Sequence, residues 1–127
     1  SAKTFGSLRQ TFENMNEGIV LLNPERQIVH FNRKLLALTG LSEGEISVGQ
    51  NIGDIYRIFF DRGDLADRMQ GKCPWTELSE SYEYLHRCKN GTMINVAGNY
   101  MDDGGFVLTF TDITRQKEWE VQLYQAK

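Results

Sequence analysis

Residues 81–88 carry the most restrictive pattern in the sequence, a strict alternation with a period of two. Three ring-bearing residues and a thiol fall on one face of the predicted strand: Tyr82, Tyr84, His86 and Cys88. The next three residues, Lys-Asn-Gly at 89–91, favour a tight turn between antiparallel strands. Residues 92–101 are therefore expected to form the partner strand, so the chain must contain an antiparallel sheet.

The remaining segments extend this hairpin into a larger sheet. Apolar runs at 18–22 and 27–31 flank an Asn-Pro-Glu-Arg turn, and residues 106–111 predict the last strand. Between the hairpins, Asn32 is a candidate N-cap for a helix that ends at Gly40, and residues 52–60 have helical spacing. Residues 72–78 are expected to form a loop. Two strands, a helical segment and three antiparallel strands predict an α+β domain with helices on one face of a five-stranded sheet.

Composition and charge narrow the possible partners. The 127 residues suit one domain with its own core. The formal net charge is −3, so neither a nucleic acid nor an anionic membrane is an expected partner. The two cysteines do not form a disulfide framework, and no apolar run could span a bilayer. We expect a cytoplasmic domain with reduced thiols, and any membrane anchor would lie outside this segment.

The N-terminal segment 1–16 predicts an amphipathic helix. Its apolar residues recur at steps of three and four and form a narrow stripe: Phe5, Leu8, Phe12 and Met15. This spacing favours pairing with a second copy of the helix. The same stripe could instead cover the open face of its own sheet, so both interpretations stay open.

The order of these motifs resembles the Per-Arnt-Sim (PAS) sensor domains. The matching stretches are GIVLLNPERQIVHFN at 18–32, LLALTGLSEGEI at 35–46, CKNGT at 88–92 and DGGFVLTFTDIT at 103–114. The closing stretch is most similar to PAS domains of bacterial sensory-box proteins, upstream of diguanylate cyclases or histidine kinases. The resemblance implies a sheet in the order 2-1-5-4-3, with a PAS core at 17–114. It also implies a homodimer, and a signalling helix that starts at 115–127 and leads to an output domain.

The resemblance further implies a small pocket between the helices and the sheet. That pocket would be largely apolar, so it would suit a small apolar ligand or be filled by side chains. The directions of His30 and Asn95 are undecided, because both of their strands carry apolar residues on each face. The pocket candidates are Val20, Leu22, Ile28, His30, Leu35, Ile52, Ile55, Tyr84, His86, Asn95, Leu108 and Phe110.

Two cofactors common among PAS sensors are not expected. Flavin photosensors of the family carry a Gly-x-Asn-Cys motif, whereas this chain has Ile52 at the cysteine position and cannot form the photoadduct. Phe110 also stands where those sensors place a relaying glutamine. Haem sensors take an axial histidine from the helix before the third strand, and residues 61–72 contain no histidine.

His86 is the most distinctive polar candidate, with two interpretations. It could contact a ligand in the pocket, or it could be a core histidine paired with a backbone group or a tyrosine. His86 and Cys88 alone supply two metal ligands, which is too few for a closed zinc site. No metal site is therefore predicted from the sequence.

The tripeptide Asp112-Ile113-Thr114 joins the last strand to the terminal helix. Asp112 or Thr114 can accept hydrogen bonds from the first free amides of that helix. The resemblance implies that this junction also couples the sheet to the output helix. The terminal helix would then project as a linker, although Trp119 could instead pack it on its own domain.

Two functions remain in competition. The first is a non-catalytic sensory module that relays a change in the pocket or in packing through the junction. The second is a ligand-free structural dimerisation module with a filled core. An enzyme is not expected, because the sequence shows no nucleophile–base pair and no phosphate loop.

Overall fold

The computed structural model describes residues 16–64 and 73–125, with only the backbone described for 122–125. The proposed dimer residues lie outside this part of the chain: Phe5, Leu8, Phe12 and Met15. None of the described helices is both long and apolar enough to cross a membrane.

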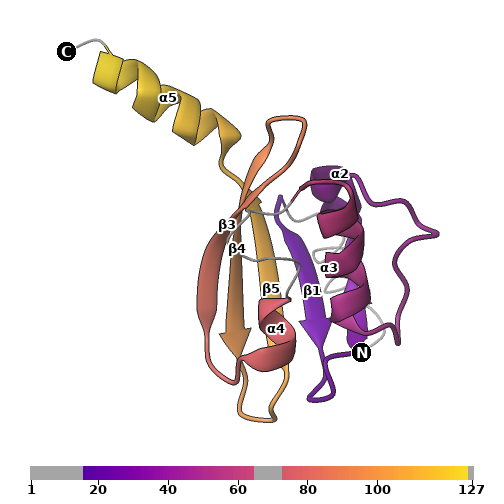
Figure 1. Cartoon of the computed structure of the whole chain (residues 1–127). Coiled ribbons are helices and arrows are strands. Elements are labelled where there is room, and N and C mark those ends of the chain that lie inside the picture. The colour runs from indigo at the N-terminus through magenta and orange to yellow at the C-terminus, as the bar shows by residue number, and fades with distance from the viewer. Residues whose placement is uncertain (1–15, 65–72, 126–127) are drawn as a thin grey trace, which may run out of the picture.

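A single five-stranded antiparallel sheet forms the frame of the domain (Figure 1). Its strands are β1 (Gly18–Leu22), β2 (Ile28–Phe31), β3 (Tyr82–Arg87), β4 (Met93–Tyr100) and β5 (Phe106–Asp112). The spatial order is β2-β1-β5-β4-β3. This arrangement confirms both the α+β class and the strand order that the resemblance implied.

Between β2 and β3, the described residues form three helices. They are α2 (Arg33–Thr39), α3 (Ile52–Asp61) and the short α4 (Pro74–Glu77). Asn32 caps α2 by accepting from the Leu35 amide, and Gly40 ends the helix with φ of 74°, a left-handed conformation that glycine adopts easily. The segment expected as a loop at 72–78 therefore contains α4. Pro74 at the first helical position pre-sets the backbone for that turn.

One face of the sheet packs against these helices, and alternation decides which side chains it buries. In β5, Phe106, Leu108 and Phe110 are buried, whereas the residues between them are half-buried on the other face. In β4, Ile94 and Val96 are likewise buried. The core lies between this face and the helices.

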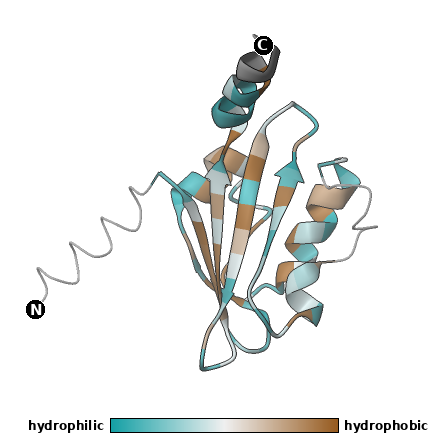
Figure 2. Cartoon of the chain, turned by 90° about the vertical axis from the view of Figure 1, so that its left-hand side faces the viewer, coloured by the Kyte–Doolittle hydropathy of each residue, from teal (hydrophilic) through white to brown (hydrophobic). Residues whose placement is uncertain are grey.

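The two ends of the sheet are built differently. The closed end comprises the β1–β2 turn at 23–27, the β4–β5 turn at 101–105 and α4. The junction end comprises the β3–β4 turn at 88–92, the last residues of α2 and α3, and residues 112–114. The terminal helix α5 (Thr114–Gln125) leaves the sheet at the junction end (Figure 1). Its exposed turns are mostly hydrophilic (Figure 2).

Candidate functional site

Large aromatic side chains fill the centre of the core. Trp75 and Tyr56 are completely buried, and the Trp75 indole N–H donates to the Tyr56 hydroxyl at 2.8 Å. Tyr56 in turn hydrogen-bonds the hydroxyl of Tyr84. Trp75 lies so close to the sheet that a Cβ added at Gly98 would sit 2.1 Å from its ring. The polar atoms of Trp75, Tyr56 and Tyr84 are thus paired with one another while their rings occupy the core.

Most of the pocket candidates meet in this core, although no ligand contact is established for any of them. These residues are buried there: Val20, Leu22, Ile28, Leu35, Ile52, Ile55, Tyr84, His86, Leu108 and Phe110. His30 was wrong as a pocket residue, because it lies opposite Leu21 and is exposed. Asn95 was wrong as well. It pairs with Thr111 and Leu85 on the face away from the helices, because β4 turns Ile94 and Val96 inward.

Arg26 connects several segments of the chain at the closed end. Its guanidinium donates to the carbonyl oxygens of Trp75 at 2.7 Å, Gly104 at 2.8 Å and Leu78 at 3.1 Å. It also lies over the Phe106 ring, 4.8 Å from the centroid. One side chain therefore ties together three segments that are distant in the sequence.

A cleft of about 510 Å³ opens at the junction end. It lies between the ends of α2 and α3, the β3–β4 turn and the end of β5. Its charged and thiol-bearing lining residues are Arg62, Asp64, Cys88, Lys89 and Asp112. The cleft thus brings titratable groups next to Asp112, the first residue of the Asp-Ile-Thr junction.

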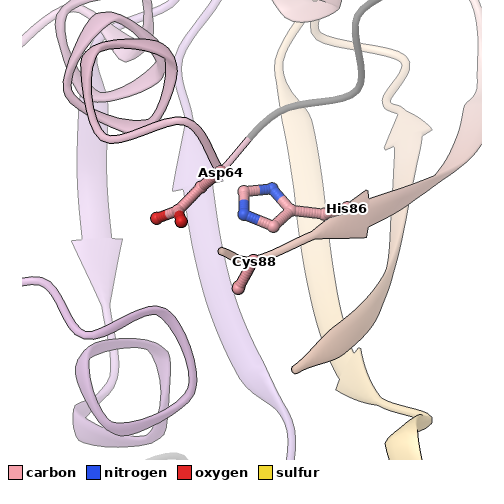
Figure 3. A group of neighbouring side chains, drawn as sticks. All are labelled: Asp64, His86 and Cys88. Carbon is pink, nitrogen blue, oxygen red and sulfur yellow. The ribbon is translucent and has the colours of Figure 1, made fainter. Parts of the chain in front are cut away.

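Three side chains with metal-binding chemistry are neighbours (Figure 3), and two of them, Asp64 and Cys88, line this cleft. One ligand atom from each of Asp64, His86 and Cys88 lies within 4.8 Å of the other two. His86 lies near the end of β3 and Cys88 directly follows that strand, and a spacing of two residues along extended chain places both side chains on one face. Asp64 follows the C-terminus of α3, and its backbone lies beside the His86 ring (Figure 3).

His86 has no polar partner in the part of the chain that the structure describes. The side chain is fully buried, and neither ring nitrogen makes a hydrogen bond. Its ring packs edge-on against Phe59, with centroids 4.8 Å apart. The expected backbone or tyrosine partner is therefore not found, because the Tyr84 hydroxyl is turned toward Tyr56.

Burial sets the charge states in this group. It lowers the pKa of His86 to about 4 against the opposing field of the Asp64 carboxylate, so the imidazole is neutral near pH 7. Burial together with the Asp64 carboxylate raises the pKa of the Cys88 thiol to about 11. Burial raises the pKa of the other thiol, Cys73, to about 12.

The junction is hydrogen-bonded to the neighbouring strand β4. The Ile113 amide donates to the Met93 carbonyl oxygen at 2.8 Å, and the Met93 amide donates to the Thr114 hydroxyl at 2.8 Å. Asp112 accepts from the Thr114 amide at 2.9 Å, as expected of a residue that caps the first turn of α5. Thr114 instead anchors the start of α5 to the edge of β4.

Trp119 does not pack α5 on its own domain. Its side chain is 59% exposed, and Val121 is 54% exposed. The expectation of a projecting helix therefore agrees with the structure, whereas a packed terminal helix does not.

Comparison with known proteins identifies the fold. The profile of the PAS fold family matches residues 12–121. The PAS domain of an HTR-like protein from Haloarcula marismortui superposes with a TM-score of 0.55 at 22% identity, covering 89% of this chain and 100% of that one. A PAS domain from a two-component sensor histidine kinase gives a TM-score of 0.55 at 13% identity, covering 87% and 97%.

A domain of a sensory box sensor histidine kinase/response regulator from Geobacter sulfurreducens gives a TM-score of 0.52 at 16% identity, covering 86% of this chain and 94% of that one. No curated protein matches the chain at a significant level. The structural likenesses bear on the fold alone at these identities, and the family profile spans most of the sequence. The chain belongs to the PAS fold family.

Proposed function

We propose that this PAS domain is a non-catalytic sensory module. In this proposal it forms a homodimer and relays a change at the junction end to a covalently linked output domain, either a diguanylate cyclase or a histidine kinase. The relay runs through Asp112, Ile113 and Thr114 into α5. Two of the similar structures come from sensor histidine kinases, which supports a role in signalling.

The observation that carries the proposal is the attachment of the junction to β4. Met93 both donates to Thr114 and accepts from Ile113, so a shift of β4 would move the first turn of α5. The cleft reaches Asp112 directly. A change in the cleft or in the β3–β4 turn therefore has a short route to the helix that leaves the domain.

The relay can be tested in a chimaera in which this chain replaces the PAS domain of a sensor histidine kinase, with α5 kept in register. Thr114→Ala removes the hydroxyl that bonds β4. We expect it to change the autophosphorylation rate by about 5-fold or more, the lower range of measured coupling between sites. Thr109→Ala, on the outer face of β5, is the matched control. Equal rates for the two variants would contradict the relay.

The filled core favours a second function, a ligand-free structural dimerisation unit. Trp75, Tyr56 and Tyr84 occupy the interior and satisfy one another's polar atoms. Holding two output domains together raises their effective concentration without any ligand. Native mass spectrometry and a visible absorption spectrum separate the two functions. A stoichiometric small molecule would contradict the structural unit, and a clean apo mass would favour it.

The homodimer is tested separately. The exposed apolar residues of α5, Trp119 and Val121, support association with another helix. Phe12→Glu places a charge in the N-terminal apolar stripe and should weaken self-association in sedimentation. Unchanged sedimentation of this variant would remove the N-terminal segment from the dimer.

A further inference from the structure

The group formed by Asp64, His86 and Cys88 is not explained by the needs of the fold. A buried imidazole with two unpaired nitrogens is unusual, because the large majority of buried polar atoms have a hydrogen-bond partner. His86 is fully buried and has none among the described residues. One of its ring nitrogens nevertheless lies within 4.8 Å of a carboxylate oxygen and of a thiol sulfur, and the three side chains are neighbours (Figure 3).

The carboxylate is already held in place by neighbours. One Asp64 oxygen accepts from the Lys89 amide at 2.9 Å, and the other accepts from the Arg62 guanidinium at 2.7 Å. The second oxygen accepts from two nitrogens of Arg62, whereas the oxygen bonded to the Lys89 amide keeps a further lone pair that can bind a cation. Hydrogen bonds of this kind orient metal-binding carboxylates in known sites. The Asp64 carboxylate is therefore held in position and can still bind a metal ion.

We propose that Asp64, His86 and Cys88 bind a divalent transition metal ion of the zinc class. A thiolate, an imidazole nitrogen and a carboxylate oxygen are all ligands that Zn²⁺ takes in proteins. The sulfur argues against Mg²⁺ and Ca²⁺, which select oxygen ligands. Coordination gives a His86 nitrogen the partner that the described residues do not supply. The Cys88 sulfur binds as the thiolate, and its proton passes to solvent.

The geometry requires only a small contraction. Zn–N and Zn–O distances of about 2.0 Å and a Zn–S distance of about 2.3 Å place tetrahedral ligand atoms about 3.3–3.5 Å apart. The three candidate atoms lie within 4.8 Å of one another, so the widest separation must close by at most about 1.5 Å. Three protein ligands leave the fourth tetrahedral position for water or a small molecule. Asp64 and Cys88 both line the cleft that also reaches Asp112, so that position is accessible from the cleft.

Ion binding is tested on the chain itself and does not depend on any output domain. Titration of the reduced protein with Co²⁺ as a spectroscopic probe should produce a thiolate-to-cobalt charge-transfer band that saturates at one ion per chain. Zn²⁺ should then displace Co²⁺ and abolish the band. No charge-transfer band in the unaltered protein would overturn the proposal, whatever the behaviour of its variants.

The two cysteines provide a matched pair of variants. Cys88→Ser removes a proposed ligand, and Cys73→Ser removes the other buried thiol, which lies outside the group. Removing a residue that only hydrogen-bonds a metal ligand already weakens metal binding by about 10–100-fold, so we expect loss of the Cys88 ligand in Cys88→Ser to weaken zinc binding by more than about 100-fold. Cys73→Ser should retain it. Equal zinc affinity in both variants, or selective loss in Cys73→Ser, would overturn the assignment.

A thiol-reactivity measurement keeps the test decisive if a variant fails to fold. In the Cys73→Ser protein, Cys88 is the only thiol. Saturating Zn²⁺ should slow its alkylation by more than about 10-fold, because the thiolate is shielded by the ion. Unchanged alkylation in the presence of Zn²⁺ would contradict ligation by Cys88.

Discussion

The closed end and the junction end of the sheet differ in how well their polar groups are paired and their space is filled. At the closed end, the Arg26 guanidinium finds three carbonyl oxygens and Trp75 fills the space above Gly98. At the junction end, a buried imidazole has no partner among the described residues, and a cleft separates the ends of the helices from the turn. The satisfied end stabilises the fold, whereas the unsatisfied end has the chemistry to bind something.

This division follows a general pattern in which functional sites carry local costs that the rest of the fold offsets. Substitutions at the two ends should therefore change the free energy of unfolding with different signs as well as different sizes.

Trp75→Ala should cause the largest loss of stability. It empties the centre of the core and leaves the Tyr56 hydroxyl without its indole donor. We expect the free energy of unfolding to fall by about 3–5 kcal/mol. Urea denaturation followed by circular dichroism measures it. A loss below about 1 kcal/mol would show that the closed end does not hold the fold.

Arg26→Ala should cause the next largest loss of stability. The variant leaves carbonyl oxygens of Trp75, Gly104 and Leu78 without their charged donor. We expect a loss of about 2 kcal/mol in the free energy of unfolding. Arg57→Ala on the exposed face of α3 is the control and should change it by less than about 0.5 kcal/mol. Equal effects would mean that the carbonyl contacts contribute nothing.

In the presence of a chelator, His86→Leu should raise the free energy of unfolding, whereas the two preceding variants lower it. It replaces a buried ring with two unpaired nitrogens by an apolar side chain of similar size. We expect the metal-free protein to gain about 1–2 kcal/mol. Tyr84→Phe, on the same strand, should instead lose stability because the Tyr56 hydroxyl loses its partner. If both variants destabilise the protein, the contrast between the two ends is wrong.

The pH dependence of stability gives the smallest effect. Burial lowers the pKa of His86 to about 4, below its ordinary value of 6.5. Between these values the unfolded chain binds more protons than the folded one, so stability rises with pH and is lost as the pH falls. From pH 6.5 to 5.5, the metal-free protein should lose about 1 kcal/mol that the His86→Leu variant retains. Identical pH profiles for the two proteins would contradict a buried neutral imidazole.

Much of the fold could be predicted from local sequence patterns. The alternation at 81–88 placed Tyr84 and His86 on the inner face, and Asn32 with Gly40 marked the bounds of α2. The placement of His30 and Asn95 among the pocket residues was wrong. Their strands are apolar on both sides, so periodicity could not choose a face. The short helix α4 was missed because four residues are too few to show a period.

The candidate metal group was only partly visible in the sequence. His86 and Cys88 share a face two residues apart, but Asp64 stands 22 positions before His86 and belongs to a different element. Only the packing of α3 against β3 brings the carboxylate to the ring. The Arg26 contacts were hidden for the same reason, since they join segments up to 78 positions apart.

Amide hydrogen exchange with and without zinc tests most directly whether only the junction end of the sheet responds to the ion. The amides of Met93 and Ile113 report on the junction end, and those of Asn23 and Arg26 report on the closed end. Saturating Zn²⁺ should slow exchange at Met93 and Ile113 while leaving Asn23 and Arg26 unchanged. Unchanged exchange at the junction end, or equal slowing at both ends, would contradict the account.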